Sequence, residues 1–375
     1  MNRRIAIVTG TRAEFGLLRS TIDAVAAHPE LECLVVAGGA HLLPPACTIE
    51  EVRGSLPLGA TLAAEVPMQV PGRIGRDADA AALGRGVSGF AEVFAELDPA
   101  AILVLGDRIE AFAAAAAGSI GGRRVVHLHG GDRAEGVADE AMRHAITALA
   151  HLHAAATEES GARLRRLGED PTTVHVVGSP AVDGLDAIGP LDDAAFEDLG
   201  SPRTVVLHHG CGLDSAAERA WIDAALAAAT AHGPTLVLSP NADPGSDVVR
   251  DRIDAAAAAN AAITRRDHLP RETFVALLQR VDAIVGNSSA GLIEAAILGC
   301  PAVNLGPRQG GRERPGSVID IERPDPDAIL RALEVAARSK RTITHPYGQP
   351  GVGPRIANLI AEAIKTPAPR KRLTF

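Results

Sequence analysis

Short runs of β-branched and other apolar residues alternate along this chain with longer segments rich in Ala and Leu. The first run is Ile5–Val8, an Ala- and Leu-containing segment follows at Phe15–Ala27, and a second run comes at Cys33–Ala37. This rhythm predicts βαβ units, in which each helix crosses over between two parallel strands. A chain with this pattern is expected to fold as an α/β protein whose parallel sheet is covered by helices.

The length of the chain and one break in the alternation predict two domains. A chain of 375 residues exceeds the usual size of a single hydrophobic core. The alternation pauses at 184–203, where Pro190, Gly200 and Pro202 are typical of a linker. We therefore expect two doubly wound Rossmann-like domains facing a cleft, with the first at 1–183 and the second at 184–351. The other predicted strands are Ala101–Leu105, Arg124–Leu128, Leu152–Ala156, Val174–Val177, Thr204–Leu207, Thr235–Leu238, Ala283–Val285 and Ala302–Leu305.

Three further segments have their own expected structures. Leu43–Gly75 is rich in Pro and Gly and is expected to form a loop region over the edge of the sheet. Helices are expected at Pro326–Ala337 and Pro354–Ile364, and the basic residues at 367–373 are expected to form a frayed tail.

Composition excludes several classes of partner. A net charge of -9 and an aromatic content of 2% disfavour a nucleic-acid-binding surface, which needs positive charge and stacking rings. No apolar run reaches the roughly 18 residues that a membrane span needs. The apolar stretch after Arg3 and Arg4 is too short for a secretory signal, and the four cysteines lack paired spacing, so we expect a cytoplasmic protein.

Two similar turns follow predicted strands of the first half. Ligands of parallel α/β sheets bind beyond the carboxyl ends of the strands, which makes these turns candidate sites. Gly10–Glu14 places Arg12 at a helix start, where an anion could bind free N–H groups, although a plain strand-to-helix turn is an equal alternative. Gly106–Glu110 places Asp107 beside Arg108, either as part of a site or as a surface ion pair.

The densest polar segment runs from His127 to His144. It contains a strand end with alternating histidines, then a Gly pair, two carboxylates at Asp139 and Glu140, and Arg143, which together suit proton transfer. His127 and His129 share one strand face, but no tight ligand set emerges and we expect no metal. His151 and His153, on the next strand, are more simply explained as core histidines.

The second half contains a candidate diphosphate site. The strand at Ala283–Val285 passes through small polar residues, Gly286–Gly291, into an expected helix that opens at Asn287. Hydroxyl and N–H groups at such a helix start can donate to a diphosphate, and Glu294, nearly two turns in, could accept from a ribose. No Walker pattern is present. A basic cluster follows in a Gly-rich loop at Arg308, Arg312 and Arg314, for which a solvated patch is the alternative.

Taken together, these motifs resemble the hydrolysing UDP-N-acetylglucosamine 2-epimerases of sialic-acid-type biosynthesis. The matching blocks span almost the whole chain in the order of that family. They are GTRAEFGLL at 10–18, GDRIEAFAAA at 106–115, HLHGGDRAEG at 127–136, DEAMRHAITALAHLH at 139–153, VVGSPAVD at 176–183, SPNADPGS at 239–246, GNSSAGLIEA at 286–295 and NLGPRQGGRERPGSVI at 304–319.

The resemblance implies a glycosyltransferase-B-like fold in which a last helix, within 352–375, completes the first domain. It also implies UDP bound mainly by the second domain and a mechanism without cofactor, in which proton loss from the second sugar carbon and departure of UDP give a glycal that adds water. The catalytic candidates are Asp107, His129, Asp139, Glu140 and His209. The substrate-binding candidates are Arg12, Arg108, Arg143, His144, Asn241, His268, Asn287, Ser288, Ser289, Gly291, Glu294, Arg308 and Arg312.

One departure from the family pattern bears on the catalytic roles. Many relatives carry a carboxylate where this chain has His129, and Glu140 or Asp132 could compensate. The expected substrate is UDP-N-acetylglucosamine, with UDP-N,N'-diacetylbacillosamine as an alternative. A glycosyltransferase and a silent UDP-sugar binding protein are the other readings, and a homodimer or homotetramer is the expected assembly.

Overall fold

The computed structural model divides the chain into two compact units, which are described separately. Unit 1 comprises Met1–Asp132, Asp139–Asp183 and Tyr347–Phe375, and unit 2 comprises Arg133–Ala138 and Gly184–Pro346. The structure describes residues 3–44, 46–73, 75–133, 140–241, 244–339, 341, 345–367, 370–371 and 374.

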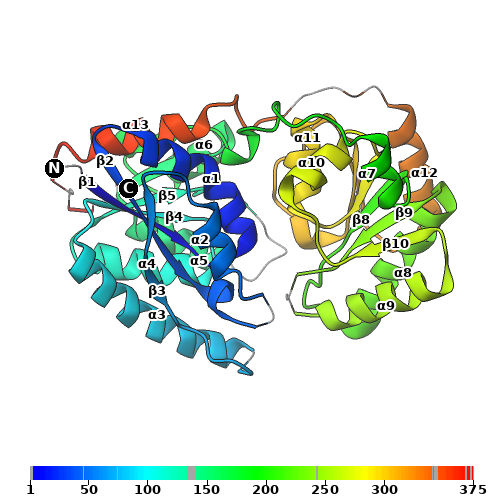
Figure 1. Cartoon of the computed structure of the whole chain (residues 1–375), viewed down its shortest axis with the longest axis horizontal. Coiled ribbons are helices and arrows are strands. Elements are labelled where there is room, and N and C mark those ends of the chain that lie inside the picture. The colour runs from blue at the N-terminus through cyan, green and yellow to red at the C-terminus, as the bar shows by residue number, and fades with distance from the viewer. Residues whose placement is uncertain are drawn as a thin grey trace. The chain divides into compact units, whose positions relative to one another are not determined.

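Unit 1 is built on a seven-stranded parallel sheet with helices on its faces (Figure 1). The strand order is β3-β2-β1-β4-β5-β6-β7. The strands are β1 (Arg3–Thr9), β2 (Leu31–Gly38), β3 (Ala60–Val66), β4 (Ala101–Leu105), β5 (Arg124–Leu128), β6 (Leu152–Ala155) and β7 (Val174–Val176). The helices are α1 (Arg12–Ala27), α2 (Ile49–Ser55), α3 (Arg76–Leu97), α4 (Ile109–Ile120), α5 (Glu140–Leu149), α6 (Glu158–Arg166) and α13 (Val352–Ala363), with short 3₁₀ turns η1 (Gly39–Leu42), η2 (Pro171–Thr173) and η3 (Pro180–Val182).

Unit 2 repeats this architecture with a six-stranded parallel sheet in the order β10-β9-β8-β11-β12-β13. Its strands are β8 (Thr204–Leu207), β9 (Thr235–Leu238), β10 (Ile263–Arg266), β11 (Ala283–Gly286), β12 (Ala302–Leu305) and β13 (Val318–Ile321). Its helices are α7 (Asp193–Asp198), α8 (Ser215–His232), α9 (Ser246–Ala259), α10 (Arg271–Leu278), α11 (Glu294–Ile297) and α12 (Pro326–Arg338), with 3₁₀ turns η4 (Ser289–Gly291) and η5 (Pro307–Gln309).

The central strands are buried because helices cover both faces of each sheet. Every residue of β4 and β5 is buried, as expected for strands inside a doubly wound sheet. Small residues let the covering helices approach closely: a Cβ on Gly86 of α3 would lie 3.0 Å from the Cβ of Ala113 on α4. The two sheets with alternating helices confirm the α/β, doubly wound fold class.

Each sheet has a point at which the strand order reverses. In unit 1 this switch point lies between β1 and β4, which pair in parallel through Ile5 and Ala101, and in unit 2 it lies between β8 and β11. The loops at the carboxyl ends of such strand pairs diverge to opposite faces and leave room for a ligand. Gly10 and Gly106 follow the first pair, whereas His208 and Asn287 follow the second.

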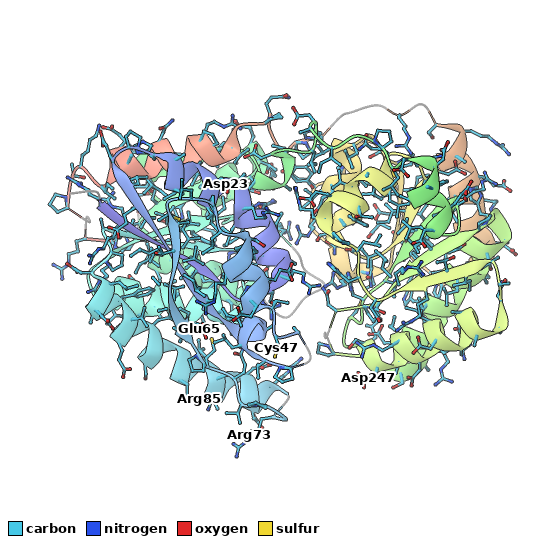
Figure 2. The ribbon with its side chains drawn as sticks, viewed as in Figure 1. Asp23, Cys47, Glu65, Arg73, Arg85 and Asp247 are labelled. Atoms are coloured by element: carbon cyan, nitrogen blue, oxygen red, sulfur yellow. The ribbon has the colours of Figure 1, made fainter. Side chains whose placement is uncertain are left out.

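Three expectations for local structure are wrong. The segment at 43–75 contains α2 and the edge strand β3, whose half-exposed residues lack the continuous apolar run that marks buried strands. Arg85 on α3 donates to Met68 O just beyond β3, and Figure 2 labels Arg85 and, on β3, Glu65. Strands β10 and β13 also lack a predicted counterpart. Within the expected frayed tail at 367–373, Lys371 is anchored, since its Nζ donates to Ala150 O at 2.6 Å, whereas 368, 369, 372 and 373 lie outside the described residues.

The last helix, α13, belongs to unit 1 and is held there at its first turn. The carboxylate of Asp183 accepts hydrogen bonds from the N–H groups of Gly351, Val352 and Gly353 at 2.7, 3.0 and 2.7 Å. These are orphan donors of a helix start, which a side-chain acceptor satisfies. Gly353 also packs directly on the backbone of Ser20 in α1, where a Cβ would lie 2.2 Å from its carbonyl oxygen.

The structure describes no helix that is both long and apolar enough to span a bilayer.

Replacing Asp183 with Ala is expected to lower the free energy of unfolding by about 1–2 kcal/mol, because a helix start loses its capping acceptor. Urea denaturation followed by far-UV circular dichroism measures the change. Asp186→Ala, at an exposed position nearby, is the matched control and should change stability by less than about 0.5 kcal/mol. Equal effects of the two variants would contradict the capping role.

Candidate functional site

A buried guanidinium organises the polar residues at the carboxyl edge of the unit 1 sheet. Arg143 on α5 is 2% exposed, and its Nη2 donates to the carboxylate of Asp107, which follows β4. Its Nη1 donates to Glu140 Oε2 at 2.5 Å and to the carbonyl oxygen of Asp132 at 2.9 Å. The structure thus brings together three predicted site residues, Asp107, Glu140 and Arg143. Asp139 lies outside the described residues.

His129 is held at both ring nitrogens by groups of unit 1. Its Nδ1 lies 2.8 Å from Asp132 Oδ2 and its Nε2 lies 3.0 Å from Ser179 Oγ. Because an ionised carboxylate only accepts, Nδ1 carries a proton, and Nε2 pairs with the hydroxyl of Ser179. Asp132 Oδ1 accepts in turn from Ser160 Oγ at 2.8 Å. His129 is only 7% exposed and adopts a left-handed φ of 64°, so its environment has to hold it in this conformation.

His127 links three elements beneath this cluster. Its Nε2 lies 2.8 Å from Gly106 O, a group that only accepts, so Nε2 is the protonated nitrogen. Nδ1 lies 3.2 Å from Thr147 Oγ1 on α5 and accepts from it. Burial lowers the pKa of His127 to about 3, so the ring stays neutral. His127 on β5 therefore connects the Gly106–Asp107 turn to α5.

Two buried glutamates at the switch point of unit 1 were missed among the predicted site residues. Glu14 Oε2 accepts from Gly10 N at 2.7 Å, and Glu110 accepts from Gln69 Nε2 at 2.8 Å and from Arg108 Nε at 3.3 Å. Burial, followed by the charge of Glu110, raises the pKa of Glu14 to about 7. A sequence signal was present: both turns have the pattern Gly-x-Arg-x-Glu, with the glutamate four residues after the glycine.

Arg12 belongs to the same region of unit 1 but is partly exposed. Its Nε lies 3.0 Å from Glu51 Oε2 on α2, and both side chains are about half exposed. A surface pair of this kind contributes little to stability and is easily exchanged for another anion. The predicted role of Arg12 in binding UDP stays a prediction.

In unit 2 the side chain of Asn287 joins the loops at the switch point. Its Oδ1 accepts from His209 N at 2.7 Å, and its Nδ2 donates to His209 O at 2.8 Å. Arg308 Nη1 and Gln309 Nε2 donate to the carbonyl oxygen of Asn287 at 3.2 and 2.8 Å. Asn287 is 0% exposed: its side chain bonds the loop after β8, and its carbonyl oxygen accepts from the loop after β12. Its predicted role in substrate binding stays a prediction.

His209 is a buried, neutral hydrogen-bond donor in this group. Its Nδ1 accepts from the backbone N–H of Asn241 at 3.1 Å, which leaves the proton of the neutral ring on Nε2. Burial, and then the charge of Arg308, lowers the pKa of His209 to about 3. A ring that stays neutral at physiological pH can donate to an anion but cannot act as a charged acid.

The expected helix opening at Asn287 is replaced by two short turns. Ser288 caps the 3₁₀ turn η4, with Ala290 N donating to its Oγ at 3.4 Å, and the α-helical turn α11 begins only at Glu294. Ile293 has φ -106° and ψ -77°, which departs from regular helical geometry and separates the two turns. Glu294 is therefore the first residue of a four-residue helix and does not lie nearly two turns into a long one.

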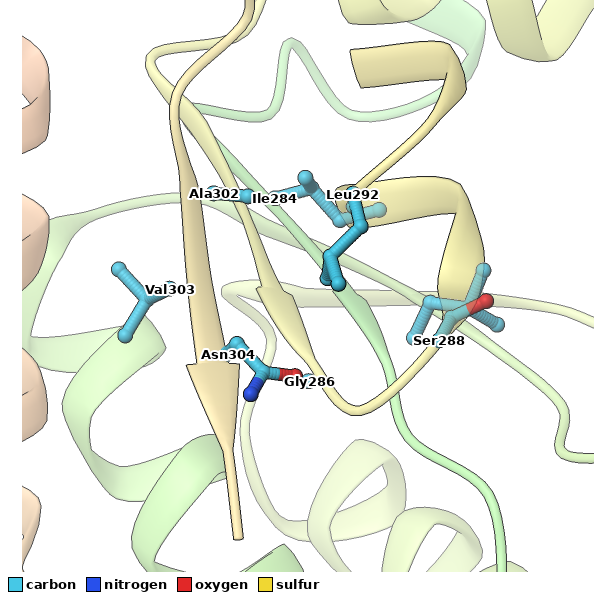
Figure 3. Close-up of a pocket in the computed structure, with 9 residues that line it drawn as sticks. Ile284, Gly286, Ser288, Leu292, Ala302, Val303 and Asn304 are labelled. Atoms are coloured by element: carbon cyan, nitrogen blue, oxygen red, sulfur yellow. The ribbon is translucent and has the colours of Figure 1, made fainter. Parts of the chain in front are cut away.

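A small cavity lies under this turn, between β8, β11 and β12 (Figure 3). Its free volume of about 10 Å³ has room for one water molecule at most, so a diphosphate does not fit inside it. Its lining is Leu207, Ile284, Gly286, Ser288, Gly291, Leu292, Ala302, Val303 and Asn304.

Three further predicted residues are His144 on α5 of unit 1 and Arg312 and His268 on loops of unit 2. His144 Nε2 lies 3.5 Å from Glu140 Oε1, Arg312 N donates to Gln309 O at 3.3 Å, and His268 is exposed in the loop after β10. Among the residues that the structure describes, no three His, Cys, Asp or Glu side chains are placed to hold a metal ion.

Comparisons with known proteins place this architecture in a class and then in a family. The structure of Methanocaldococcus jannaschii UDP-GlcNAc 2-epimerase in complex with UDP-GlcNAc and UDP has a TM-score of 0.78 to this chain at 19% identity, covering 96% of this chain and 99% of that one. The two doubly wound units thus have a glycosyltransferase-B-like fold.

The sequence model described as UDP-N-acetylglucosamine 2-epimerase matches residues 23–361. A UDP-N,N'-diacetylbacillosamine 2-epimerase (hydrolyzing) from Legionella pneumophila is 32% identical over 373 residues, 96% of each chain. A UDP-N-acetylglucosamine 2-epimerase from Neisseria meningitidis serogroup B is 28% identical over 85% of this chain and 84% of its own. The chain belongs to the UDP-N-acetylglucosamine 2-epimerase family.

The free energy of unfolding of the Glu14→Gln variant, relative to that of the wild type, is expected to increase as pH rises from 5 to 8. A carboxyl group whose pKa is higher in the folded chain than the ordinary 4.5 stabilises the fold below about pH 4.5, and this contribution is lost as pH rises through about 7. Gln keeps an oxygen for Gly10 N and has no proton to lose.

Urea denaturation of both proteins at several pH values measures the difference in free energy of unfolding. Glu96→Gln, at an exposed position of α3, is the control and should give a difference that does not vary with pH. A Glu14→Gln difference equally independent of pH would show that Glu14 ionises normally.

Proposed function

We propose that the chain is a hydrolysing 2-epimerase that converts UDP-N-acetylglucosamine and water into UDP and N-acetylmannosamine. The observation that carries this proposal is the Arg143 cluster, in which a buried guanidinium fixes Asp107 and Glu140 at the carboxyl edge of the unit 1 sheet. Proton transfer at carbon needs an acid or base held in one orientation. Family membership supports the same chemistry.

In the proposed reaction a carboxylate takes the proton from the second carbon of the sugar. The bond between the first carbon and the UDP oxygen breaks, its electron pair leaves with UDP, and a glycal with a double bond between the two carbons remains. Water then supplies a hydroxyl group to the first carbon, and an acid returns a proton to the second carbon from the opposite face. The sequence consumes one water and involves no net oxidation or reduction. Asp107 and Asp139 are the proposed acid and base.

The remaining catalytic candidates have distinct proposed roles. Glu140 shares the Arg143 guanidinium with Asp107 and could take over one proton-transfer step. His129 is hydrogen-bonded at both ring nitrogens, which suits it to orient Asp132. Many relatives carry a carboxylate at the position of His129, and we assign the role of that carboxylate to Asp132 or Glu140. These roles assign acid–base chemistry to unit 1.

We propose that unit 2 binds the UDP moiety at the loops after β8, β11 and β12. Ser288 and Ser289 offer hydroxyl groups, the neutral His209 offers Nε2–H, and Arg308 and Arg312 supply positive charge for the diphosphate. The M. jannaschii relative of the same fold binds UDP-GlcNAc and UDP, which supports a nucleotide site of this class. We propose that the enzyme works in the cytoplasm as a homodimer or homotetramer.

A second candidate substrate is UDP-N,N'-diacetylbacillosamine. The Legionella pneumophila protein that is 32% identical to this chain acts, by its name, on that sugar nucleotide and is hydrolysing. The chemistry at the first two carbons would be the same, and only the groups at the far side of the ring would differ.

In heavy water the purified protein is expected to release N-acetylmannosamine that carries deuterium at the second carbon, because the returning proton comes from solvent. Proton NMR of parallel reactions with UDP-N-acetylglucosamine and UDP-N,N'-diacetylbacillosamine identifies the product and the preferred substrate. Release of N-acetylglucosamine without deuterium would indicate plain hydrolysis. Turnover only after addition of an alcohol would indicate glycosyl transfer, and either result would refute the proposed reaction.

Asp107→Asn is expected to lower turnover by about two or more powers of ten, the scale of a lost general acid or base. UDP affinity, measured by calorimetry, should stay nearly unchanged because the nucleotide is proposed to bind unit 2. Asp98→Asn is the control, since Asn also tolerates the left-handed φ of 42° at this exposed position. A parallel loss of turnover and UDP affinity would assign Asp107 to binding or folding instead.

A further inference from the structure

Lys371, near the end of the chain, donates three hydrogen bonds to buried groups of unit 1. Its Nζ lies 3.3 Å from Thr147 O and 2.6 Å from Ala150 O, and it also bonds the carboxylate of Glu169. An ammonium group has three N–H donors, so these acceptors use all of them. Only three of the 37 Lys and Arg residues in this chain are lysines, and here the compact ammonium meets three acceptors around one point.

Two of these acceptors are carbonyl groups at the carboxyl end of helix α5. The last carbonyls of a helix have no partner within it, and the helix dipole places partial negative charge there. Helix α5 has no basic residue in its own last turn. Lys371 therefore supplies the positive charge that the helix sequence lacks, from a position more than 200 residues further along the chain.

Other contacts hold the segment around Lys371 against unit 1. Arg124 Nη2 donates to the carbonyl oxygens of Thr366 and Pro367 at 3.1 and 2.9 Å. Glu169, which is 2% exposed, lies 2.8 Å from His153 Nε2. Burial alone raises the pKa of Glu169, but the hydrogen bonds and charges of His153 and Lys371 outweigh it and hold the pKa below its usual value. Glu169 is thus a charged partner for the ammonium.

Two chains of hydrogen bonds connect α5 to Asp107, the proposed proton-transfer residue. Arg143 in its first turns bonds the carboxylate of Asp107. Thr147, whose carbonyl oxygen accepts from Lys371, bonds His127 through its hydroxyl, and His127 donates to Gly106 O next to Asp107. The position of α5 therefore sets the position of Asp107.

We propose that Lys371 is a positioning residue of the acid–base site: by capping α5 it holds Arg143 and Thr147 where they orient Asp107. This inference rests on the proposed function only in that Asp107 transfers a proton. The C-terminal segment is then part of the machinery for turnover although it contacts no reacting atom. A misplacement of the order of 1 Å at a catalytic group is enough to cost a large factor in rate.

Lys371→Met is expected to lower kcat about 10- to 100-fold while KM and UDP affinity change less than about twofold. Lys365→Met is the matched control, since Lys365 is an exposed lysine of the same C-terminal region whose Nζ donates to Glu362 Oε2 at 2.6 Å. The control should keep wild-type kcat. Lys371→Arg, which retains charge and donors, should recover at least part of the lost turnover.

Loss of Lys371 alone leaves the Glu169 charge buried without its ammonium partner, which destabilises the fold. The double variant Glu169→Gln with Lys371→Met removes both charges and keeps an acceptor for His153, so it should fold while still lacking the cap. Its kcat should fall as in the single variant. Wild-type kcat in this double variant, or equal losses of kcat and UDP affinity, would overturn the proposal.

Two measurements separate positioning from a general loss of stability. In the Asp107→Asn background, Lys371→Met should cause little further loss of kcat, because both changes act on one group; a full additional loss would contradict the proposal. Amide hydrogen exchange should rise in peptides that cover Glu140–Leu149 and stay unchanged in β8. Unchanged exchange in α5 would refute the capping role of Lys371. This measurement does not depend on turnover of a UDP-sugar, so it tests the Lys371 proposal separately from the proposed function.

Discussion

The burial of the Arg143 guanidinium is the constraint on which the unit 1 site depends. A positive charge that is 2% exposed has to be surrounded by acceptors, since removing it from water is costly. Its acceptors come from the end of β4, from α5 and from the loop after β5. Three elements therefore converge on one planar group, and a planar fork with several donors is what makes this possible.

Burial also decides the ionisation of the residues around both switch points. It lowers the pKa of His127, His208 and His209 to about 3 and raises that of Glu14 to about 7. The direction differs with residue type, but in each case the neutral form is favoured because a desolvated charge is unfavourable. Neutral histidines can then act as fixed hydrogen-bond donors, as His127 does towards Gly106 O.

The expectations that failed depended on local pattern where tertiary contacts decide. The edge strand β3 has a half-exposed face, so its residues carry no long apolar run, and pairing with β2 is what makes it a strand. The turn after β11 was expected to continue as one helix, but Ser288 caps a 3₁₀ turn and Asn287 is committed to His209. The basic tail appeared free because its partners, Glu169 and the carbonyls of α5, are distant in sequence.

The sequence by itself determined the α/β class, because the periodicity of apolar residues indicates which side chains are buried. It also determined the site motifs, because their polar residues directly follow the predicted strands. It also carried the repeated Gly-x-Arg-x-Glu pattern of Glu14 and Glu110, which became meaningful once β1 and β4 were neighbours. Only the tertiary structure decided which groups meet: Arg143 with Asp107, His129 with Ser179, and Lys371 with α5. Such pairings arise from packing between distant segments, and no local propensity encodes them.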